Sequence, residues 1–187
     1  MLGFPALRTY ALACVLLALF CFPAFGKGTL LPEEAALPFD ISGAKAAKII
    51  VYKAERRMDL LDKNGWPLRS YQVSLGKDPI GDKRQEGDGK TPEGNYIIDG
   101  RNPKSKFHLS LRISYPNQSD LWRSRKMGIK DPGRDIFIHG LPNGKGWMRW
   151  KYNKKNDWTD GCIAVDNDEI EELWNLVDDG TPILIKP

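Results

Sequence analysis

Cysteine and histidine are scarce in this chain of 187 residues, which has three of the first and two of the second. Cys14 and Cys21 lie near the amino terminus, so Cys162 is the only cysteine in the rest of the sequence. A single cysteine cannot form an internal disulfide, and stability must therefore come from packing. One thiol and two dispersed histidines, His108 and His139, also lack the close ligand spacing of a zinc site, so we expect no bound metal.

Long hydrophobic runs are also few. The apolar run Ala11–Phe22 has 12 residues, whereas a membrane-spanning helix needs about 20. Arg8 precedes the run, and Ala24-Phe25-Gly26 follows it with small residues at the spacing of a cleavage site. Residues 1–26 therefore predict a signal peptide, with an uncleaved anchor as the alternative. In either case the remainder of the chain would lie in the periplasm or cell envelope.

No sign of charge dominates, because 28 basic and 24 acidic residues are interleaved and the net charge is +4. The chain therefore lacks the concentrated basic face that nucleic-acid binding needs. An anionic polymer such as cell wall remains compatible with this balance. We expect no nucleic-acid partner, and contact with a membrane only if the leader is retained.

The body of the sequence predicts one domain. Residues 27–44 are polar and contain prolines without a sustained period, which is typical of a tether, and residues 45–187 suit a single core. Alternating or continuous apolar residues predict strands at Ile49–Tyr52, Met58–Leu61, Leu68–Leu75, Tyr96–Ile98, Phe107–Ile113, Ile136–Ile138 and Pro182–Ile185. Asp62–Gly65 ends in Asn-Gly and predicts a hairpin between the second and third of these strands. Five glycines between Gly76 and Gly94 predict a long irregular loop.

Helical periodicity appears near the carboxyl terminus. The apolar residues at i, i+3, i+4 and i+7 are Ile170, Leu173, Trp174 and Val177. Asp166 and Glu169 form a capping-box pair before them, and Gly180 marks the expected end. The predicted fold class is therefore mainly β, with this amphipathic helix and a short second helix at Ser119–Met127.

Cys162 and His139 are the residues that could carry chemistry. A cysteine nucleophile reacts as its thiolate and needs a base or a positive field to lower a pKa of about 8.5. His139 ends a predicted strand and is followed by Gly140, so its ring would emerge at a sheet edge where Cys162 could meet it. Gly161 would let the backbone approach a substrate carbonyl, where the N–H of Cys162 could bind an oxyanion. From these residues alone, a buried inert cysteine and a structural histidine remain the alternative.

Two sequence blocks resemble one known family. Ile136-Phe137-Ile138-His139-Gly140, followed after a loop by Thr159-Asp160-Gly161-Cys162-Ile163-Ala164-Val165, is similar to the His-Gly and Ser/Thr-His-Gly-Cys signature of the YkuD-type L,D-transpeptidases. The stretch Gly87–Gly94 resembles the Thr-Pro-x-Gly element of that family. The resemblance runs from about Ile49 to Ile185, and the Thr-x-Gly-Cys-x-Ala-Val variant is similar to a YafK-like branch.

The resemblance implies a β-rich catalytic domain that acts on peptidoglycan stem peptides without a metal or organic cofactor. Cys162 would attack the carbonyl before a terminal D-alanine, His139 would accept its proton, and the backbone carbonyl of Gly140 would orient the imidazole. Gly161 and Cys162 would bind the oxyanion. An amine of another stem peptide or of a wall-anchored protein would then take the acyl group, and water in its place would make the enzyme a hydrolase.

Two departures from the common family pattern affect the substrate site. Asp160 replaces a histidine and Ala164 replaces an arginine, which removes a contact for a carboxylate or backbone group. An ionised Asp160 would oppose formation of the Cys162 thiolate unless it points away or pairs with Lys154 or Lys155.

The residues expected to contact substrate are Thr159, Asp160, Trp147, Trp150, Arg112 and Tyr115. Aromatic and basic residues gather in Leu141–Trp158 and predict a substrate lid, with an anchor to the core as the alternative. Three function classes follow: a cysteine acyltransferase, a peptidoglycan hydrolase with the same Cys-His pair, and a noncatalytic wall-binding module.

Overall fold

The computed structural model describes residues 43–145 and 156–187. The strands in these ranges are β1 (Lys48–Tyr52), β2 (Arg57–Leu61), β3 (Pro67–Gln72), β4 (Gly94–Ser105), β5 (His108–Ile113), β6 (Phe137–His139), β7 (Ile163–Ala164) and β8 (Pro182–Lys186). The helices are α1 (Gln118–Lys126) and α2 (Asn167–Leu176). The predicted class, mainly β with two helices, is confirmed.

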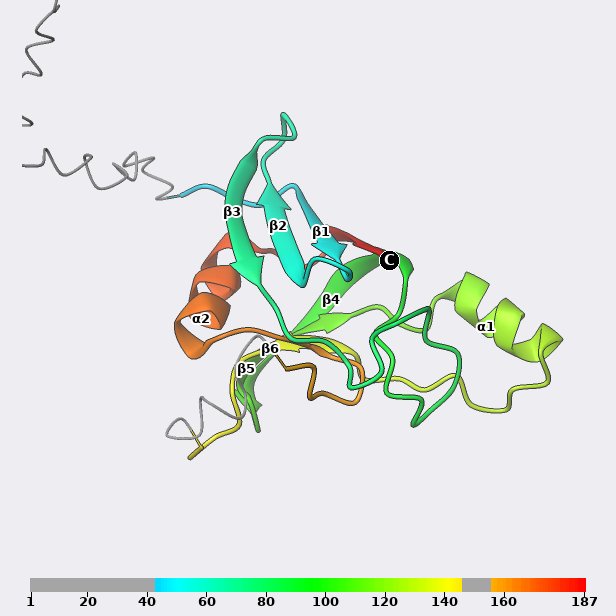
Figure 1. Cartoon of the computed structure of the whole chain (residues 1–187). Helices are drawn as coiled ribbons and strands as arrows, with labels where there is room; N and C mark the ends of the chain where they lie inside the picture. Colours follow the sequence, from blue (N-terminus) through cyan, green and yellow to red (C-terminus); the bar gives the residue numbers. More distant parts are fainter. Residues whose placement is uncertain (1–42, 146–155) are drawn as a thin grey trace, which may run out of the picture. The chain divides into compact units, whose positions relative to one another are not determined.

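The strands form one curled sheet in the order β3-β2-β1-β8-β4-β5-β6-β7 (Figure 1). β1 pairs parallel to β8 and β6 parallel to β7, while the other pairs are antiparallel. Register shifts after Ile98 and Asn102 interrupt the pairing of the long strand β4 with β5. The curl closes where Ser74, just beyond β3, exchanges two backbone hydrogen bonds of 2.9 and 2.8 Å with Ala164 of β7. Cys162 therefore lies beside the seam of the sheet.

The core fills the inside of the curl and continues beneath α2. Apolar side chains alternate along the strands, so that Ile49 and Val51 of β1 are fully buried while their neighbours are not. Leu111, Ile138 and Ile163 continue the same cluster across β5, β6 and β7. This packing fixes β6 and β7, the two short strands that carry the candidate site.

The hairpin between β2 and β3 follows the expected chemistry. The two strands pair antiparallel, and Gly65 takes φ +85° in the turn, a conformation that an L side chain rarely adopts. The Asn-Gly prediction is therefore confirmed.

Helix α2 begins at the predicted cap and ends before the predicted residue. The N–H of Asp166 donates to the Glu169 carboxylate at 2.9 Å, which completes the capping box. Ile170 and Leu173 are fully buried, and α2 packs on β5 and β6. The helix stops at Leu176, before the predicted end at Gly180, because Val177 is already extended.

Two buried lysines hold the glycine-rich segment between β3 and β4 in place. Lys53 donates from Nζ to the carbonyl oxygens of Gly81 and Thr91 at 2.6 and 2.9 Å and pairs with Glu93 at 2.8 Å. Lys83 donates to the Asp88 carboxylate at 2.9 Å. A buried ammonium group is tolerated because carboxylate and carbonyl oxygens surround it. The loop predicted from the glycines is therefore ordered by ion pairs, and it forms one wall of the cavity described below.

Neither helix of the described residues has the length and apolar character needed to cross a membrane.

Candidate active site

The sheet register brings Cys162 and His139 to the same face. Ile138 of β6 pairs with Ile163 of β7, and His139 pairs with Ala164. Because side chains alternate along a strand, Cys162 lies on the face shared by Ala164 and His139. A strand separation of about 4.8 Å and a rise of about 3.3 Å per residue put the two Cα atoms about 8 Å apart on the diagonal.

The imidazole of His139 packs in a cluster with two aromatic rings. Its ring centroid lies 4.4 Å from that of Phe107 and 5.7 Å from that of Trp158, the second in an edge-on arrangement. The Gly140 carbonyl lies 2.7 Å from Nδ1, and since a carbonyl can only accept, Nδ1 carries the hydrogen. Burial lowers the pKa of His139 to about 4, against the opposing effect of the Gly140 bond. The ring is therefore neutral at pH 7, and Nε2 is left as a proton acceptor.

The thiol of Cys162 is half-buried and protonated at rest. Sγ donates to the backbone carbonyl of Asp135 at 3.6 Å. The pKa of Cys162 is raised to about 11, mainly by burial and also by the nearby Asp160 and Asp135, while the backbone N–H of Phe137 and the Lys83 ammonium act in the opposite direction. The resting thiol is thus not pre-ionised, and any activation has to come with proton transfer.

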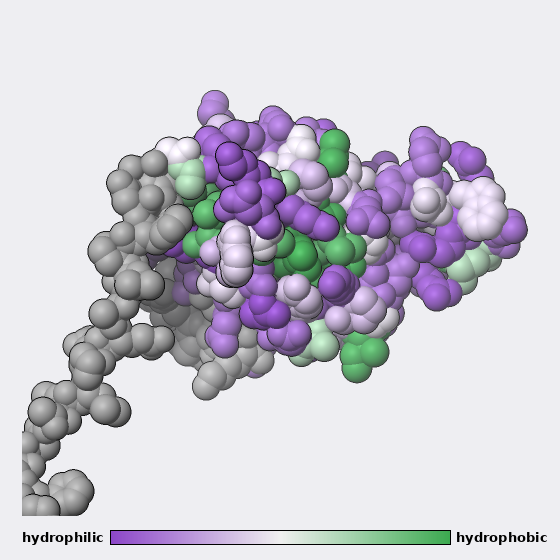
Figure 2. Space-filling model, turned by 90° about the horizontal axis from the view of Figure 1, so that it is seen from above, coloured by the Kyte–Doolittle hydropathy of each residue, from purple (hydrophilic) through white to green (hydrophobic). Residues whose placement is uncertain are grey.

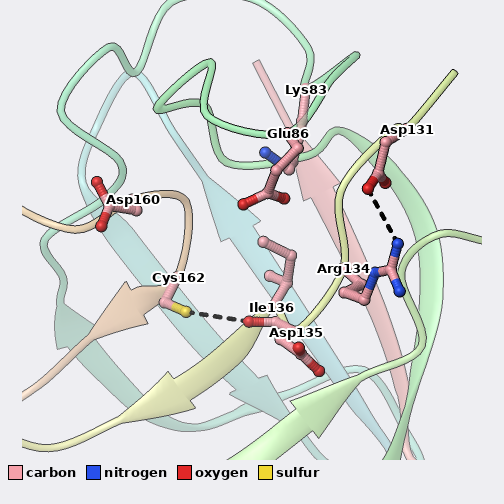
Figure 3. A pocket seen from close by; sticks show the side chains of 8 residues that line it. All are labelled: Lys83, Glu86, Asp131, Arg134, Asp135, Ile136, Asp160 and Cys162. Carbon is pink, nitrogen blue, oxygen red and sulfur yellow. Dashed lines mark hydrogen bonds and ion pairs between the residues drawn. The ribbon is translucent and has the colours of Figure 1, made fainter. Parts of the chain in front are cut away.

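Cys162 opens into a cavity of about 350 Å³ that carries charges of both signs. Its other lining residues are Lys83, Glu86, Asp131, Arg134, Asp135, Ile136 and Asp160. Figure 3 shows Sγ of Cys162 directed toward the backbone carbonyl of Asp135. The Glu86 carboxylate lies elsewhere in the cavity lining. His139 is only 3% exposed and is not among the residues that line this cavity.

The turn before Cys162 is fixed by Thr159. The hydroxyl of Thr159 donates to the carbonyl of Cys162 at 2.7 Å and accepts from the N–H of Gly161 at 3.1 Å. Gly161 has φ +138°, and a Cβ there would lie 2.7 Å from the carbonyl oxygen of Lys90. The prediction that Gly161 donates to an oxyanion does not fit, because its N–H is already bonded. The N–H of Cys162 remains the backbone donor available beside the thiol.

Two other predicted contact residues, Asp160 and Arg112, line different hollows. Asp160 lines it and pairs with Lys77 at 2.9 Å, whereas the expected partners Lys154 and Lys155 lie outside the described residues. Arg112 is exposed, pairs with Asp99 at 2.8 Å and lines a separate hollow with Asp135 and Phe137.

Tyr115 does not suit a substrate contact. It is buried, and its hydroxyl donates to the carbonyl of Pro132 at 2.8 Å. Trp147 and Trp150, on which the predicted lid depends, lie outside the described residues. Trp158, from the same aromatic segment, packs against His139 and Phe107, so that end of the segment acts as an anchor.

Ala164 occupies the position at which an arginine was expected from the family pattern. Its side chain is buried at 2% exposure beside His139, so it cannot contact a substrate.

Lys83, Glu86 and Asp135 are among the cavity residues that were not expected from the sequence. Lys83 is fully buried, and the Glu86 and Asp135 side chains are exposed at the rim. Nothing distinguishes these three among the many charged residues of the two loops that carry them. Only the fold of the glycine-rich segment against residues 131–136 brings them to Cys162.

No cluster of three or more His, Cys, Asp or Glu side chains suited to a metal ion occurs within residues 43–145 and 156–187.

A half-buried thiol at an open cavity, with a neutral imidazole on the same face of a curled sheet, defines the class as a candidate cysteine-dependent enzyme domain. Residues 46–185 match the YkuD family, described as the L,D-transpeptidase catalytic domain, and the chain belongs to this family.

Individual relatives agree with this assignment. YafK of Escherichia coli (strain K12), named provisionally as an L,D-transpeptidase, is 29% identical over 134 residues, which are 69% of this chain and 46% of that protein. The structure of Bd1075 from Bdellovibrio bacteriovorus is similar with a TM-score of 0.54 at 28% identity, over 79% of this chain and 50% of that one. The chain thus spans about half the length of the relatives it matches.

The helical cell shape determining protein Pgp2 from Campylobacter jejuni has the same fold. Its TM-score is 0.58 at 22% identity, over 74% of this chain and 46% of that chain.

Proposed function

We propose that this chain is an exported cysteine acyltransferase that acts on peptidoglycan stem peptides through a Cys162 thioester. The observation that carries the proposal is the shared face of Cys162 and His139 beside an open cavity, in a chain of the L,D-transpeptidase family. The proposed place of action is the periplasm or cell envelope, as expected from residues 1–26. The likeness to a cell shape determining protein supports a role in remodelling the wall.

In the first half of the reaction, the thiol of Cys162 transfers its proton to Nε2 of His139 as sulfur attacks the carbonyl carbon. The negative charge on the carbonyl oxygen is held by the N–H of Cys162. Proton transfer creates a thiolate and an imidazolium close together, so their attraction offsets the desolvation that disfavours each charge alone. Collapse of the intermediate breaks the C–N bond, and His139 returns the proton to the leaving amine.

In the second half, an acceptor amine attacks the thioester and gives a proton to His139. The C–S bond breaks, and the departing thiolate of Cys162 takes the proton from the imidazolium. Gly140 keeps Nδ1 of His139 bonded throughout, so that Nε2 is the atom that exchanges protons. Hydrolysis differs only in that water replaces the amine, which leaves an L,D-carboxypeptidase or an amidase acting on wall-protein linkages as the alternative.

The test incubates the purified protein with a disaccharide tetrapeptide, with and without a D-amino acid of different mass, and measures the products by mass spectrometry. Exchange of the terminal residue supports transfer, and loss of that residue without exchange assigns hydrolysis. Cys162→Ala is the matched control. Turnover by Cys162→Ala equal to that of the parent would overturn both activities and leave a wall-binding module.

A further inference from the structure

Helix α1 presents an exposed aromatic and basic face. Trp122 is 58% exposed, and the ammonium group of Lys126, four residues on, lies 4.1 Å from the centre of its ring. Residues three and four apart share a helix face, so Arg125 belongs to the same surface. Lys130 lies beyond the helix end and is exposed, as is Met127, whose sulfur accepts from the guanidinium group of Arg84 at 3.6 Å. We call Trp122, Arg125, Lys126, Met127 and Lys130 the α1 surface.

The opposite face of α1 is committed to the body of the domain. Asp120 is buried, accepts from the hydroxyl of Tyr96 at 3.3 Å and pairs with Arg123 at 2.5 Å. Arg123 also pairs with Asp82 of the glycine-rich segment at 2.9 Å. The orientation of the helix is therefore fixed, and the α1 surface faces outward.

The helix dipole accounts for part of this pattern only. Basic residues are favourable in the last turn of a helix, which would explain Arg125 and Lys126. It explains neither a largely exposed Trp122 in the middle of the helix nor Lys130 beyond its end. Within the described ranges, Arg125, Lys126 and Lys130 make no ion pair with an acidic side chain, so a ligand would find three available cations.

The α1 surface is followed directly in the sequence by a segment that lines the cavity of Cys162. The chain runs from Met127 through Lys130 directly into Asp131 and Arg134, which line that cavity. Figure 1 shows α1 away from α2, at the side where the glycine-rich segment lies. Figure 2 shows this end of the molecule extending from the body with a mostly hydrophilic surface. A polymer lying on α1 would therefore lie on the part of the chain that leads into the cavity wall.

We propose that the α1 surface binds an anionic glycan polymer, the cell wall itself, as a second contact outside the cavity. This inference rests on the proposed function, because that function names the wall as substrate. An exposed indole offers a flat apolar face for a sugar ring, and the three cations suit the carboxylates of the attached peptides. Holding the polymer here raises the effective concentration of its stem peptides at Cys162.

A lipid bilayer fits the same surface less well. A helix that lies in a membrane interface presents a broad apolar face, as well as basic residues, to the lipid. On α1 the outward apolar groups are Trp122 and Met127, while Leu121 is half-buried against the body. Figure 2 shows hydrophobic residues gathered on the body rather than at this end. The observations therefore favour a polar polymer.

The test compares the parent protein with the triple variant Trp122→Ala/Arg125→Gln/Lys126→Gln. The replacements, alanine and glutamine, both favour a helix, so α1 should stay folded. A matched control, Trp66→Ala/Lys63→Gln, removes an exposed tryptophan and lysine at the β2–β3 turn. Cosedimentation with purified sacculi should weaken about tenfold in the triple variant, because a stacked ring and two ion pairs are lost, and stay unchanged in the control. Turnover of a soluble tetrapeptide should stay within about twofold of the parent, because the cavity is intact.

Unchanged binding of the triple variant to sacculi would overturn the inference. Equal loss in the Trp66 control would do so as well. The same holds if the triple variant loses binding only to vesicles with 30% phosphatidylglycerol, since the surface would then serve a membrane. Sacculus binding does not depend on turnover, so an inactive parent protein would contradict the proposed function while this comparison still decides the role of α1.

Discussion

His139 ends β6, and Cys162 directly precedes the parallel strand β7, two residues before the register partner of His139. The fold does not ionise either group at rest, because burial raises the pKa of the thiol to about 11 and lowers the pKa of the imidazole to about 4. In the proposed mechanism, reactivity therefore depends on substrate-linked proton transfer from sulfur to Nε2. The following predictions separate this account from that of a preformed thiolate.

Alkylation of Cys162 by iodoacetamide should be slow at neutral pH. Below the pKa the thiolate fraction rises tenfold per pH unit, so the rate should increase about 100-fold from pH 7 to pH 9 without reaching a plateau. The modification is followed by mass on the peptide that carries Cys162. A plateau near pH 7 would mean that the resting enzyme holds a thiolate, contrary to the structure.

The buried neutral His139 should make the protein less stable in acid. Its pKa is about 4 when folded and near 6.5 when unfolded, so the unfolded chain binds the additional proton between these values and stability falls as the pH drops. Between pH 7 and pH 5 the free energy of unfolding should decrease by about 2 kcal/mol from this residue. Urea denaturation of the parent and of His139→Gln measures the difference.

If His139→Gln loses as much stability as the parent over this pH range, another group is responsible. His108→Gln serves as the control, because His108 is half-buried and bonded to Glu171 at 2.6 Å, away from the cavity.

Packing of Phe107 on the imidazole should help to keep the pKa of His139 low. Phe107→Ala would admit water beside the imidazole and raise the pKa of His139 toward its ordinary value, since burial is the cause of the depression. The acid limb of the pH–rate profile should move to higher pH, and kcat/KM should fall about tenfold because the ring is less well oriented. Phe107→Leu retains an apolar side chain and should keep the low pKa. Superimposable profiles for the parent and Phe107→Ala would refute this role.

Gly161 should tolerate no side chain. Gly161→Ala combines an unfavourable φ with a Cβ 2.7 Å from the Lys90 carbonyl, so the free energy of unfolding should fall by about 3 kcal/mol. Gly180→Ala has a positive φ and open space around it, and should cost about 1 kcal/mol. Thermal or urea unfolding gives both values. Equal losses at the two positions would show that the contact with Lys90 has no effect.

Most strands could be predicted because their apolar residues follow the period of a sheet. The hairpin at Asn64-Gly65 and the start of α2 at Asp166 were set by local turn and cap chemistry, which acts within a few residues. The end of α2 was predicted too late, since Val177 has the right helical spacing yet adopts an extended conformation. Tertiary packing, which the local sequence pattern does not show, decides between helix and extended chain at Val177.

The site could be predicted only in part. Cys162 and His139 stood out because cysteine and histidine are rare and each lies beside a glycine. Lys83, Glu86 and Asp135 did not, because only the folded chain brings the two loops that carry them together at the cavity. Tyr115 was expected near substrate, but its position in the sequence gives no measure of its burial.

The central claim is tested most directly by intact-mass measurement of the protein during turnover of a tetrapeptide substrate. The account predicts an acyl adduct on the peptide that carries Cys162, slower to form in His139→Gln and absent in Cys162→Ala. Product formation by Cys162→Ala at the parent rate, with no adduct on the parent protein, would contradict it.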